Sequence, residues 1–290
     1  MYHLFIKLLF RLKLLPLFNL RKKIDIDGNK IRIPLFGNLG YFNFNLTEVW
    51  MTQVLRQLKP IFKGAFVDVG VNTGQTLIKA HGVFGKMEYV GFEPNPVCVH
   101  YVQNLIRLNN FNCKLLPVGV SSETGILKLN FYYDEETDQS ASILQQFRLD
   151  QPIHHSLYVP VFNGQSVVQL LPAQQHSILK IDVEGAELDV LKGLQEWIVA
   201  RQPIILSEIL PVYTPSHPDY TLRVQRQQEM QQLLRNWDYR IARLVKNNTI
   251  AVQLLETIEP HSDMELCDYI IFPAGLQAQV LQCFEQKPTA

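Results

Sequence analysis

Short apolar runs alternate with helical stretches along most of this 290-residue chain, and this alternation constrains its fold more than any other feature. The runs cover residues 65–69, 88–92, 114–118, 177–181 and 203–207. Such runs are typical of parallel strands that helices cover on both faces. Helical patterns lie between them at residues 76–83, 96–108, 167–171 and 186–199, and a helix at 221–236 precedes strands near 239–245 and 267–272. The sequence therefore predicts a doubly wound α/β fold with a mostly parallel, seven-stranded sheet that binds ligands at its carboxyl edge.

The first 46 residues do not continue this alternation. Residues 24–44 are β-like and carry turn signals at Asp27-Gly28-Asn29 and Gly37-Asn38, so we expect a small hairpin. A helix over 47–58, capped by Thr47, follows. We expect residues 1–46 to form an N-terminal cap of amphipathic helix and hairpin, and residues 47–290 to form one Rossmann-like domain.

Residues 4–20 are strongly apolar, yet they contain Lys7, Arg11 and Lys13 and are interrupted by Pro16. A membrane-spanning helix needs about 20 apolar residues with few charges, and no signal-peptide cleavage pattern follows this segment. Two interpretations stay open. The segment is either a peripheral helix at a membrane surface, or an amphipathic helix that packs on the domain or on a second subunit of a homodimer.

The chain between residues 119 and 161 is longer than an ordinary crossover. It offers a hairpin-like pair around Gly125 and then a polar stretch, residues 134–151, with the acidic run Asp134-Glu135-Glu136. Long loops over the carboxyl edge of a sheet often hold substrate. We therefore expect this insertion to be a substrate loop.

The charge, cysteine and histidine content limits which partners and metal sites we expect. Lysine plus arginine and aspartate plus glutamate both total 27, so no basic field favours nucleic acid. The four cysteines are too dispersed for a zinc pair or a disulfide framework, which predicts reduced thiols in a cytoplasmic protein. The eight histidines show no metal spacing, although His154, His155 and His217 are placed where they could approach the cleft. We expect no metal.

Two strand ends predict a nucleotide-like ligand. Strand one ends at Asp68, and Gly70 and Gly74 bracket the turn into the next helix. This spacing differs from the Gly-x-Gly-x-x-Gly of dinucleotide binders, which cradle a pyrophosphate. This turn suits S-adenosylmethionine better than a dinucleotide, because S-adenosylmethionine has no pyrophosphate and carries an ammonium group that a nearby acid attracts. Strand two ends at Glu93, where a carboxylate can accept both ribose hydroxyls.

Strands four and five bring further carboxylates to the same edge. Asp182, Glu184 and Glu187 cluster where a helix begins, and Glu208 ends strand five. Acids at a helix start also serve the cap and the helix dipole, which is the structural alternative. In the functional interpretation Asp182 orients or deprotonates an acceptor hydroxyl, and Glu184 or Glu208 assists. A cation at Asp182 and Glu208 would need more oxygen ligands than the sequence supplies.

Four segments in this order resemble the FkbM-type methyltransferases, which are class I S-adenosylmethionine enzymes acting mostly on hydroxyls of sugars and natural products. They are Asp68-Val-Gly-Val-Asn-Thr-Gly74, Phe92-Glu-Pro-Asn-Pro96, Val118-Gly-Val-Ser-Ser122 and Lys180-Ile-Asp-Val-Glu-Gly-Ala-Glu187. The resemblance covers roughly residues 47–209. The family usually has a Leu-Asp pair before strand four, where this chain has Ser166-Val167-Val168, so substrate contacts of that segment do not carry over.

The resemblance implies a site for each part of the methyl donor S-adenosylmethionine. Asp68, Gly70, Asn72 and Gly74 would surround its methionine part, Glu93 its ribose, and the segment near Val118 its adenine. The expected activity is O-methylation of a small-molecule, glycolipid or other glycan acceptor. Two alternatives are a nicotinamide-dependent oxidoreductase, which shares the glycine turn and the acid at strand two, and a non-catalytic interaction module that has kept the fold.

Overall fold

The computed structural model describes residues 8–9, 12, 14, 20–35, 39–135, 137–144, 147–247 and 249–285. Most of the amphipathic helix expected at residues 4–20 lies outside the described residues. Within the described part of the chain, no helix combines the length and the apolar character needed to cross a bilayer.

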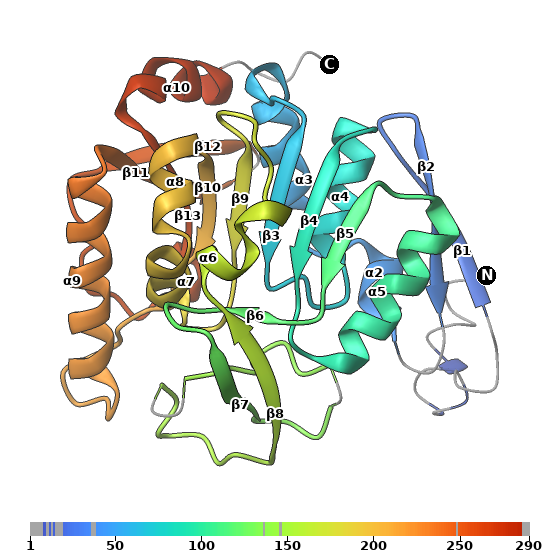
Figure 1. Cartoon of the computed structure of the whole chain (residues 1–290), viewed down its shortest axis with the longest axis horizontal. Helices are drawn as coiled ribbons and strands as arrows, with labels where there is room; N and C mark the ends of the chain where they lie inside the picture. The colour runs from blue at the N-terminus through green and yellow to red at the C-terminus, as the bar shows by residue number, and fades with distance from the viewer. Residues whose placement is uncertain are drawn as a thin grey trace.

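The described strands form a central eight-stranded sheet in the order β12-β11-β13-β10-β9-β3-β4-β5 (Figure 1). Strands β5, β4, β3, β9 and β10 run parallel to one another, whereas β13 is antiparallel to both β10 and β11. The predicted doubly wound, mostly parallel α/β fold is confirmed, and β12 adds an edge strand that pairs with β11. The strand bounds are β3 Ala65–Val69, β4 Glu88–Phe92, β5 Cys113–Leu116, β9 Ile178–Ile181, β10 Ile204–Glu208, β11 Tyr239–Lys246, β12 Ile250–Leu255 and β13 Asp268–Pro273.

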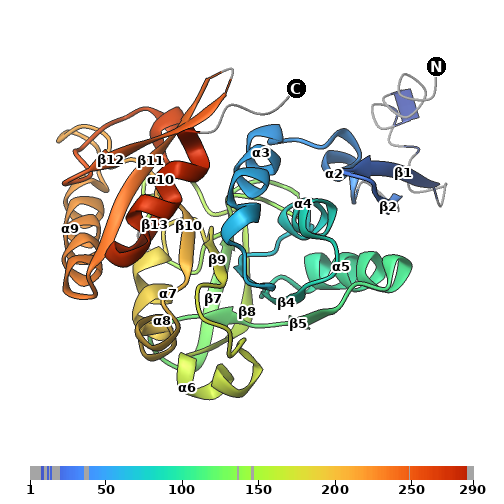
Figure 2. The same cartoon turned by 90° about the horizontal axis from the view of Figure 1, so that it is seen from above.

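Helices cover both faces of this sheet, as the view from above shows (Figure 2). Neighbouring strand residues face opposite sides, so Phe66 belongs to one hydrophobic cluster and Val67 to the other. The first cluster receives α3 Val49–Leu58, α4 Gln75–Phe84, α5 Pro96–Asn109 and α10 Gln277–Glu285, and the second receives α7 Glu187–Gly193, α8 Gln195–Arg201 and α9 Tyr220–Asn236.

Two predicted helices differ from the structure. The helix expected over residues 186–199 is divided into α7 and α8, because the chain bends after Gly193, whose backbone approaches the Ser121 carbonyl too closely for a side chain. The helix expected at residues 167–171 begins earlier, as α6 Gly164–Val167, and continues as a 3-10 turn. Asn163 starts it by accepting a hydrogen bond from the backbone N–H of Ser166 at 3.2 Å.

The expected N-terminal hairpin is present as β1 Leu20–Ile26 and β2 Asn29–Leu35. Its isoleucines join the hydrophobic cluster of α4, where Gly82 leaves space for Ile26. The β-like pattern expected to continue to residue 44 ends instead in the short helix α2 Tyr41–Asn45. Helix α3 begins at Val49 after Glu48, so Thr47 does not cap it.

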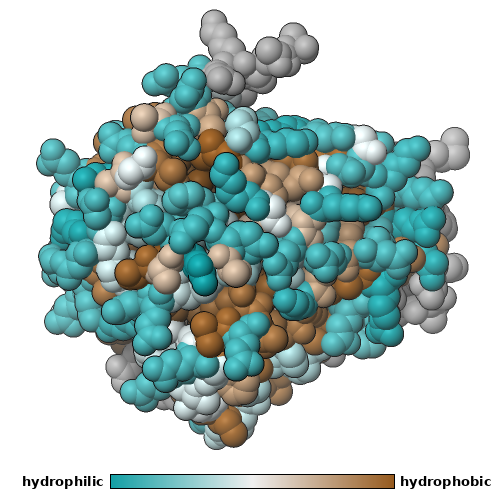
Figure 3. Space-filling model, turned by 45° about the horizontal axis from the view of Figure 1, so that its top comes forward, coloured by the Kyte–Doolittle hydropathy of each residue, from teal (hydrophilic) through white to brown (hydrophobic). Residues whose placement is uncertain are grey.

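The insertion forms a small sheet of β6 Gly119–Val120, β7 Gly125–Phe131 and β8 His155–Phe162, which lies below the central sheet in Figure 1. Its strand order is β6-β8-β7, so the two strands around Gly125 both pair with β8 and do not pair with each other as expected. On the face in Figure 3 hydrophilic side chains predominate, and hydrophobic ones gather in patches toward its centre.

Candidate active site

A cleft opens at the carboxyl ends of the central strands and is bordered by the insertion. The turn after β3, the tip of β4 and the ends of β9 and β10 line it, and residues of β6, β7 and the following loop close its other side. The predicted site residues that line this cleft are Gly70, Asn72, Glu93, Asp182, Glu184 and Glu208. The structure thus brings together six of the nine residues that the sequence assigned to a site.

The turn after β3 places backbone, rather than side chains, against the cleft. Gly70 has φ +89°, and a Cβ atom there would lie 1.9 Å from the carbonyl oxygen of Asp182. Asn72 also adopts a left-handed conformation, with φ 48°, and its Oδ1 accepts the Thr73 backbone N–H at 2.6 Å. Only glycine avoids both the strain and the collision at residue 70. The glycine therefore lets the β9 loop close over the turn.

Glu93 is buried at the tip of β4, and backbone donors fix its carboxylate. Oε2 accepts the Asn72 N–H at 2.6 Å, and Oε1 accepts the Asn95 N–H at 2.8 Å. Burial raises the pKa of Glu93 to about 7, against the opposing effect of these two backbone donors. Each carboxylate oxygen can accept a further hydrogen bond, so the group suits a ligand with two adjacent hydroxyls.

Asp68, in contrast, does not line the cleft. Its side chain is fully buried, it accepts a hydrogen bond from the Tyr89 hydroxyl, and its Oδ1 lies 3.3 Å from Lys180 Nζ. The sheet register puts Asp68 directly beside Lys180. Burial raises the pKa of Asp68, although Lys180 and Tyr89 oppose this shift. The same Lys180 ammonium also donates a hydrogen bond to the Gly70 carbonyl at 2.8 Å. Asp68 therefore supports the glycine turn from beneath, through Lys180.

The carboxylates of β9 and β10 form the opposite wall of the cleft. Asp182, one third exposed, lies 3.2 Å from Lys180 Nζ through its Oδ2. Burial and the neighbouring Asp182 raise the pKa of Glu208 to about 9, so Glu208 carries a proton at neutral pH. Because one group can donate a hydrogen bond while its neighbour accepts one, this wall suits a hydroxyl-bearing ligand.

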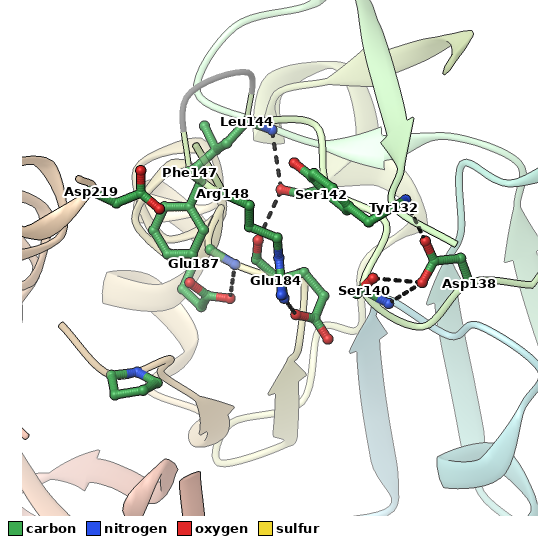
Figure 4. Close-up of polar contacts among 12 residues, drawn as sticks. Tyr132, Asp138, Ser140, Ser142, Leu144, Phe147, Arg148, Glu184, Glu187 and Asp219 are labelled. Carbon is green, nitrogen blue, oxygen red and sulfur yellow. Dashed lines mark hydrogen bonds and ion pairs between the residues drawn. The ribbon is translucent and has the colours of Figure 1, made fainter. Parts of the chain in front are cut away.

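The loop of the insertion packs over Glu184 (Figure 4). Arg148 forms an ion pair with the Glu184 carboxylate, and the Ser142 hydroxyl donates to the Glu184 carbonyl at 2.8 Å. Burial, followed by the nearby Asp182, raises the pKa of Glu184 to about 8, against the effect of Arg148. The backbone of Glu184 is left-handed, with φ 55°. Gly185 follows it, where a side chain would collide with Phe147. The loop is thus fixed to the cleft.

Three other predicted residues do not line the cleft. Val118 is buried in the hydrophobic cluster, and its successors Gly119 and Val120 line the cleft instead. Gly74 serves as the N-cap of α4, with φ 79°. Asp68, described above, also lies outside the lining of the cleft. Glu187, one of the clustered acids, accepts the Gly185 N–H at 2.9 Å and so serves the local turn.

The histidines considered for the site lie elsewhere. His154, His155 and His217 are absent from the residues that line the cleft. A ring nitrogen of His217 and a carboxylate oxygen each of Asp150 and Asp219 lie within 4.8 Å of one another, as in a possible metal site. The Asp219 carboxylate, however, already accepts a hydrogen bond from the Leu149 N–H at 3.1 Å. All four cysteines carry free thiols, as predicted.

The family model described as the methyltransferase FkbM domain matches residues 68–241, which is more than half of the chain. The chain belongs to the FkbM methyltransferase family. The family predicted from the four motifs is therefore confirmed, and the match contains both walls of the cleft.

Two curated proteins similar to this chain carry methyltransferase names. "Methyltransferase 1" of Beauveria bassiana is 27% identical over 144 residues, which cover 45% of this chain and 58% of that protein. "Methyltransferase sdnD" of Sordaria araneosa is 26% identical over 171 residues, covering 48% and 64%. The matches thus span less than two thirds of either relative. The crystal structure of an FkbM methyltransferase from Methylobacillus flagellatus is 15% identical, with a TM-score of 0.43, and covers 75% of this chain and 47% of that one.

Sequence reasoning missed Lys180 and Glu48, which line the cleft, and Arg148, which pairs there with Glu184. Lys180 is signalled by its place in the apolar run 178–181, because a charge inside a buried strand requires a partner. Arg148 and Glu48 carry no such signal, since they lie in segments whose path only the folded structure reveals.

Proposed function

We propose that this chain is an O-methyltransferase that moves the methyl group of S-adenosylmethionine to a hydroxyl of a carbohydrate, glycolipid or natural-product acceptor. The observation that carries the proposal is the pairing of two walls in one cleft. One wall offers the doubly anchored Glu93 beside the glycine turn, and the other offers Asp182, Glu184 and Glu208. Membership of the FkbM family supports the same reaction class.

The residues present fit the methyl donor. When bound, S-adenosylmethionine supplies an electrophilic methyl group on a sulfonium. The two outward lone-pair sites of Glu93 suit its ribose diol, since a carboxylate at the second strand tip is the usual partner of such a diol. Phe92, Pro94, Val120 and Leu129 add apolar surface to the cleft near this carboxylate, which suits an adenine ring.

The opposite wall would serve the acceptor. A sugar hydroxyl is a weak nucleophile, so a group that accepts its proton helps the transfer. Asp182 is the proposed base, because it is partly exposed to the cleft and its other contact, Lys180, holds it in place. The protonated Glu208 would donate a hydrogen bond that orients the acceptor, and Glu184 would support it from beneath the insertion loop. Orientation of the reacting groups supplies a large part of such a rate enhancement.

Methyl transfer to a mixed panel of glycans, glycolipids and extracted small molecules tests this proposal. Each compound is incubated with the chain and with isotope-labelled S-adenosylmethionine, and the products are analysed by mass spectrometry for one added labelled methyl on oxygen. We expect labelled product with the wild type and a large loss with Asp182→Asn, which retains affinity for S-adenosylhomocysteine. The exposed Asp263→Asn variant is the matched control and keeps full activity.

Three results would contradict the proposal or part of it. Label found only on protein or nucleic acid would overturn the acceptor class. An undiminished rate in Asp182→Asn would remove Asp182 from the mechanism. Binding of the methyl donor without labelling of any compound would favour the non-catalytic alternative.

A further inference from the structure

The amino-acid end of the methyl donor requires partners for an ammonium and a carboxylate. The resemblance places Asp68 among the residues around the methionine part of the donor, yet Asp68 has no exposed surface and is already bonded to Tyr89 and Lys180. A ligand therefore cannot reach Asp68 without displacing a buried ion pair. A different carboxylate on the cleft must take this part, if the function proposed above holds.

We propose that Glu48 binds the ammonium group of S-adenosylmethionine, and that the first turn of α4 beside it receives the carboxylate. This inference rests on the proposed function and deepens it. Glu48 lies outside the 68–241 match to the FkbM family, in the segment that leads into α3. The proposal thus assigns part of the cofactor site to the N-terminal region.

Glu48 lines the cleft together with Trp50 and Met51 of α3 and with Gln75 and Thr76 of α4. Its side chain is 46% exposed, which leaves its carboxylate accessible to a ligand. Oε2 lies 2.8 Å from Lys79 Nζ, and within the described residues Oε1 accepts no hydrogen bond.

The backbone of Glu48 adopts a left-handed conformation at the edge of the cleft. Its φ and ψ are 55° and 53°, in the left-handed region that residues other than glycine, asparagine and aspartate rarely adopt. Such strain is concentrated at functional sites.

Charge favours an ionised carboxylate at this place. Burial alone would raise the pKa of Glu48, but the ammonium groups of Lys79, Lys180 and Lys246 outweigh burial and lower it. Lys79 is almost fully buried, with 2% of its side chain exposed, so its charge depends on Glu48. The pair presents a negative oxygen toward the cleft with a positive group directly behind it.

Helix α4 provides a complementary site for the carboxylate of the same ligand end. It is ten residues long, and no side chain caps its N-terminus after Gly74. Its first-turn residues Gln75 and Thr76 line the cleft next to Glu48. Uncapped N–H groups and the helix dipole attract an anion. Ammonium and carboxylate partners therefore lie side by side, as an amino acid requires.

Calorimetric titration with two ligands that differ only by the amino-acid end tests the inference. S-adenosylhomocysteine carries this end, and 5′-methylthioadenosine lacks it. For Glu48→Gln we expect the Kd of S-adenosylhomocysteine to rise about ten- to a hundredfold, since a charge-assisted hydrogen bond is lost, while the Kd of methylthioadenosine stays unchanged. Glu88→Gln, which removes an exposed partner of Lys114, is the matched control and alters neither Kd.

The ratio of the two affinities keeps the test independent of folding. A partly unfolded variant weakens the binding of both ligands equally. A rise of both Kd values by the same factor, or of neither, therefore overturns the role of Glu48. Should Glu48→Gln fail to fold, Glu48→Asp withdraws the carboxylate by one methylene, and the same selective loss is expected. If wild-type protein binds neither ligand, the proposed function itself is wrong, and this outcome is distinct from the others.

Discussion

The carboxylate of Glu93 accepts the backbone N–H of Asn72 at 2.6 Å, so the tip of β4 is bonded to the turn that follows β3. A second backbone donor, Asn95, holds the other oxygen. These bonds orient the carboxylate before any ligand arrives. Preorganisation of this kind increases affinity, because the ordering cost has already been met in the free protein.

Glu93→Gln tests this arrangement through binding. An amide has one acceptor oxygen instead of two and would set its NH₂ against a backbone N–H. We therefore expect the Kd values of S-adenosylhomocysteine and methylthioadenosine to rise together, about tenfold or more. Calorimetric titration of both ligands measures this. Equal loss for the two ligands separates Glu93 from Glu48, and an unchanged Kd for both would refute the ribose contact.

The raised pKa of Glu93 predicts a pH dependence of binding. Burial places this pKa at about 7, and the ionised carboxylate is the form that accepts two hydroxyls. Affinity for methylthioadenosine should therefore fall as the pH decreases from 8 to 6, because protons compete for Glu93. The decrease should be absent in Glu93→Gln. A titration series across this range that is flat in the wild type would contradict the assignment.

Lys180→Met tests the buried charges beneath the glycine turn. The change leaves Asp68 buried without its cation, which costs about 3–5 kcal/mol in the free energy of unfolding. Lys114→Met removes an exposed partner of Glu88 and should cost less than about 1 kcal/mol. Urea unfolding measures both. The double variant Asp68→Asn with Lys180→Met should recover part of the loss, and a stable single variant would show that the pair is dispensable.

Gly70→Ala tests the closeness of the β9 loop to the turn. The positive φ alone costs an alanine about 1 kcal/mol, and the collision with the Asp182 carbonyl adds to this. Gly28→Ala is the matched control, because Gly28 has a similar φ of +85° and open space around it. We expect Gly70→Ala to unfold at a clearly lower urea concentration than Gly28→Ala. Equal midpoints would mean that the two backbones can move apart freely.

Glu208→Gln tests the proton that burial assigns to this carboxyl. Its folded pKa of about 9 exceeds the ordinary value of 4.5, so the stability that protonation provides is present at low pH and lost as the pH rises toward 9. The variant cannot ionise, and its melting temperature relative to the wild type should increase between pH 5 and pH 9 by several degrees. The exposed Glu256→Gln should show no such trend. A constant difference for Glu208→Gln would contradict the raised pKa.

The sequence was sufficient to predict the sheet, because its strands are continuous apolar runs and helices of clear periodicity separate them. The strands at residues 65–69 and 88–92 were predicted at their observed bounds, and Glu93 follows directly from the second. The local pattern was insufficient wherever long-range contact decides. The strands on either side of Gly125 look like a hairpin in sequence, but β8 intervenes between them.

In the site, too, local sequence predicts some features, whereas long-range contacts decide others. A carboxylate at a strand tip can be located from its neighbours in sequence, which is how Glu93, Asp182 and Glu208 were found. Whether an acid faces the cleft or the core depends on its partners across the sheet. Asp68 points beneath the turn because Tyr89 and Lys180 receive it there, and neither contact is visible in the spacing of the motif.

Calorimetric titration of the wild-type chain with S-adenosylhomocysteine and, separately, with NAD⁺ shows which cofactor the cleft accepts. We predict saturable binding of one S-adenosylhomocysteine per chain and no heat of binding for NAD⁺, because the glycine turn lacks the spacing that cradles a pyrophosphate. Saturable binding of NAD⁺ without binding of S-adenosylhomocysteine would show that the cleft is not a methyl-donor site.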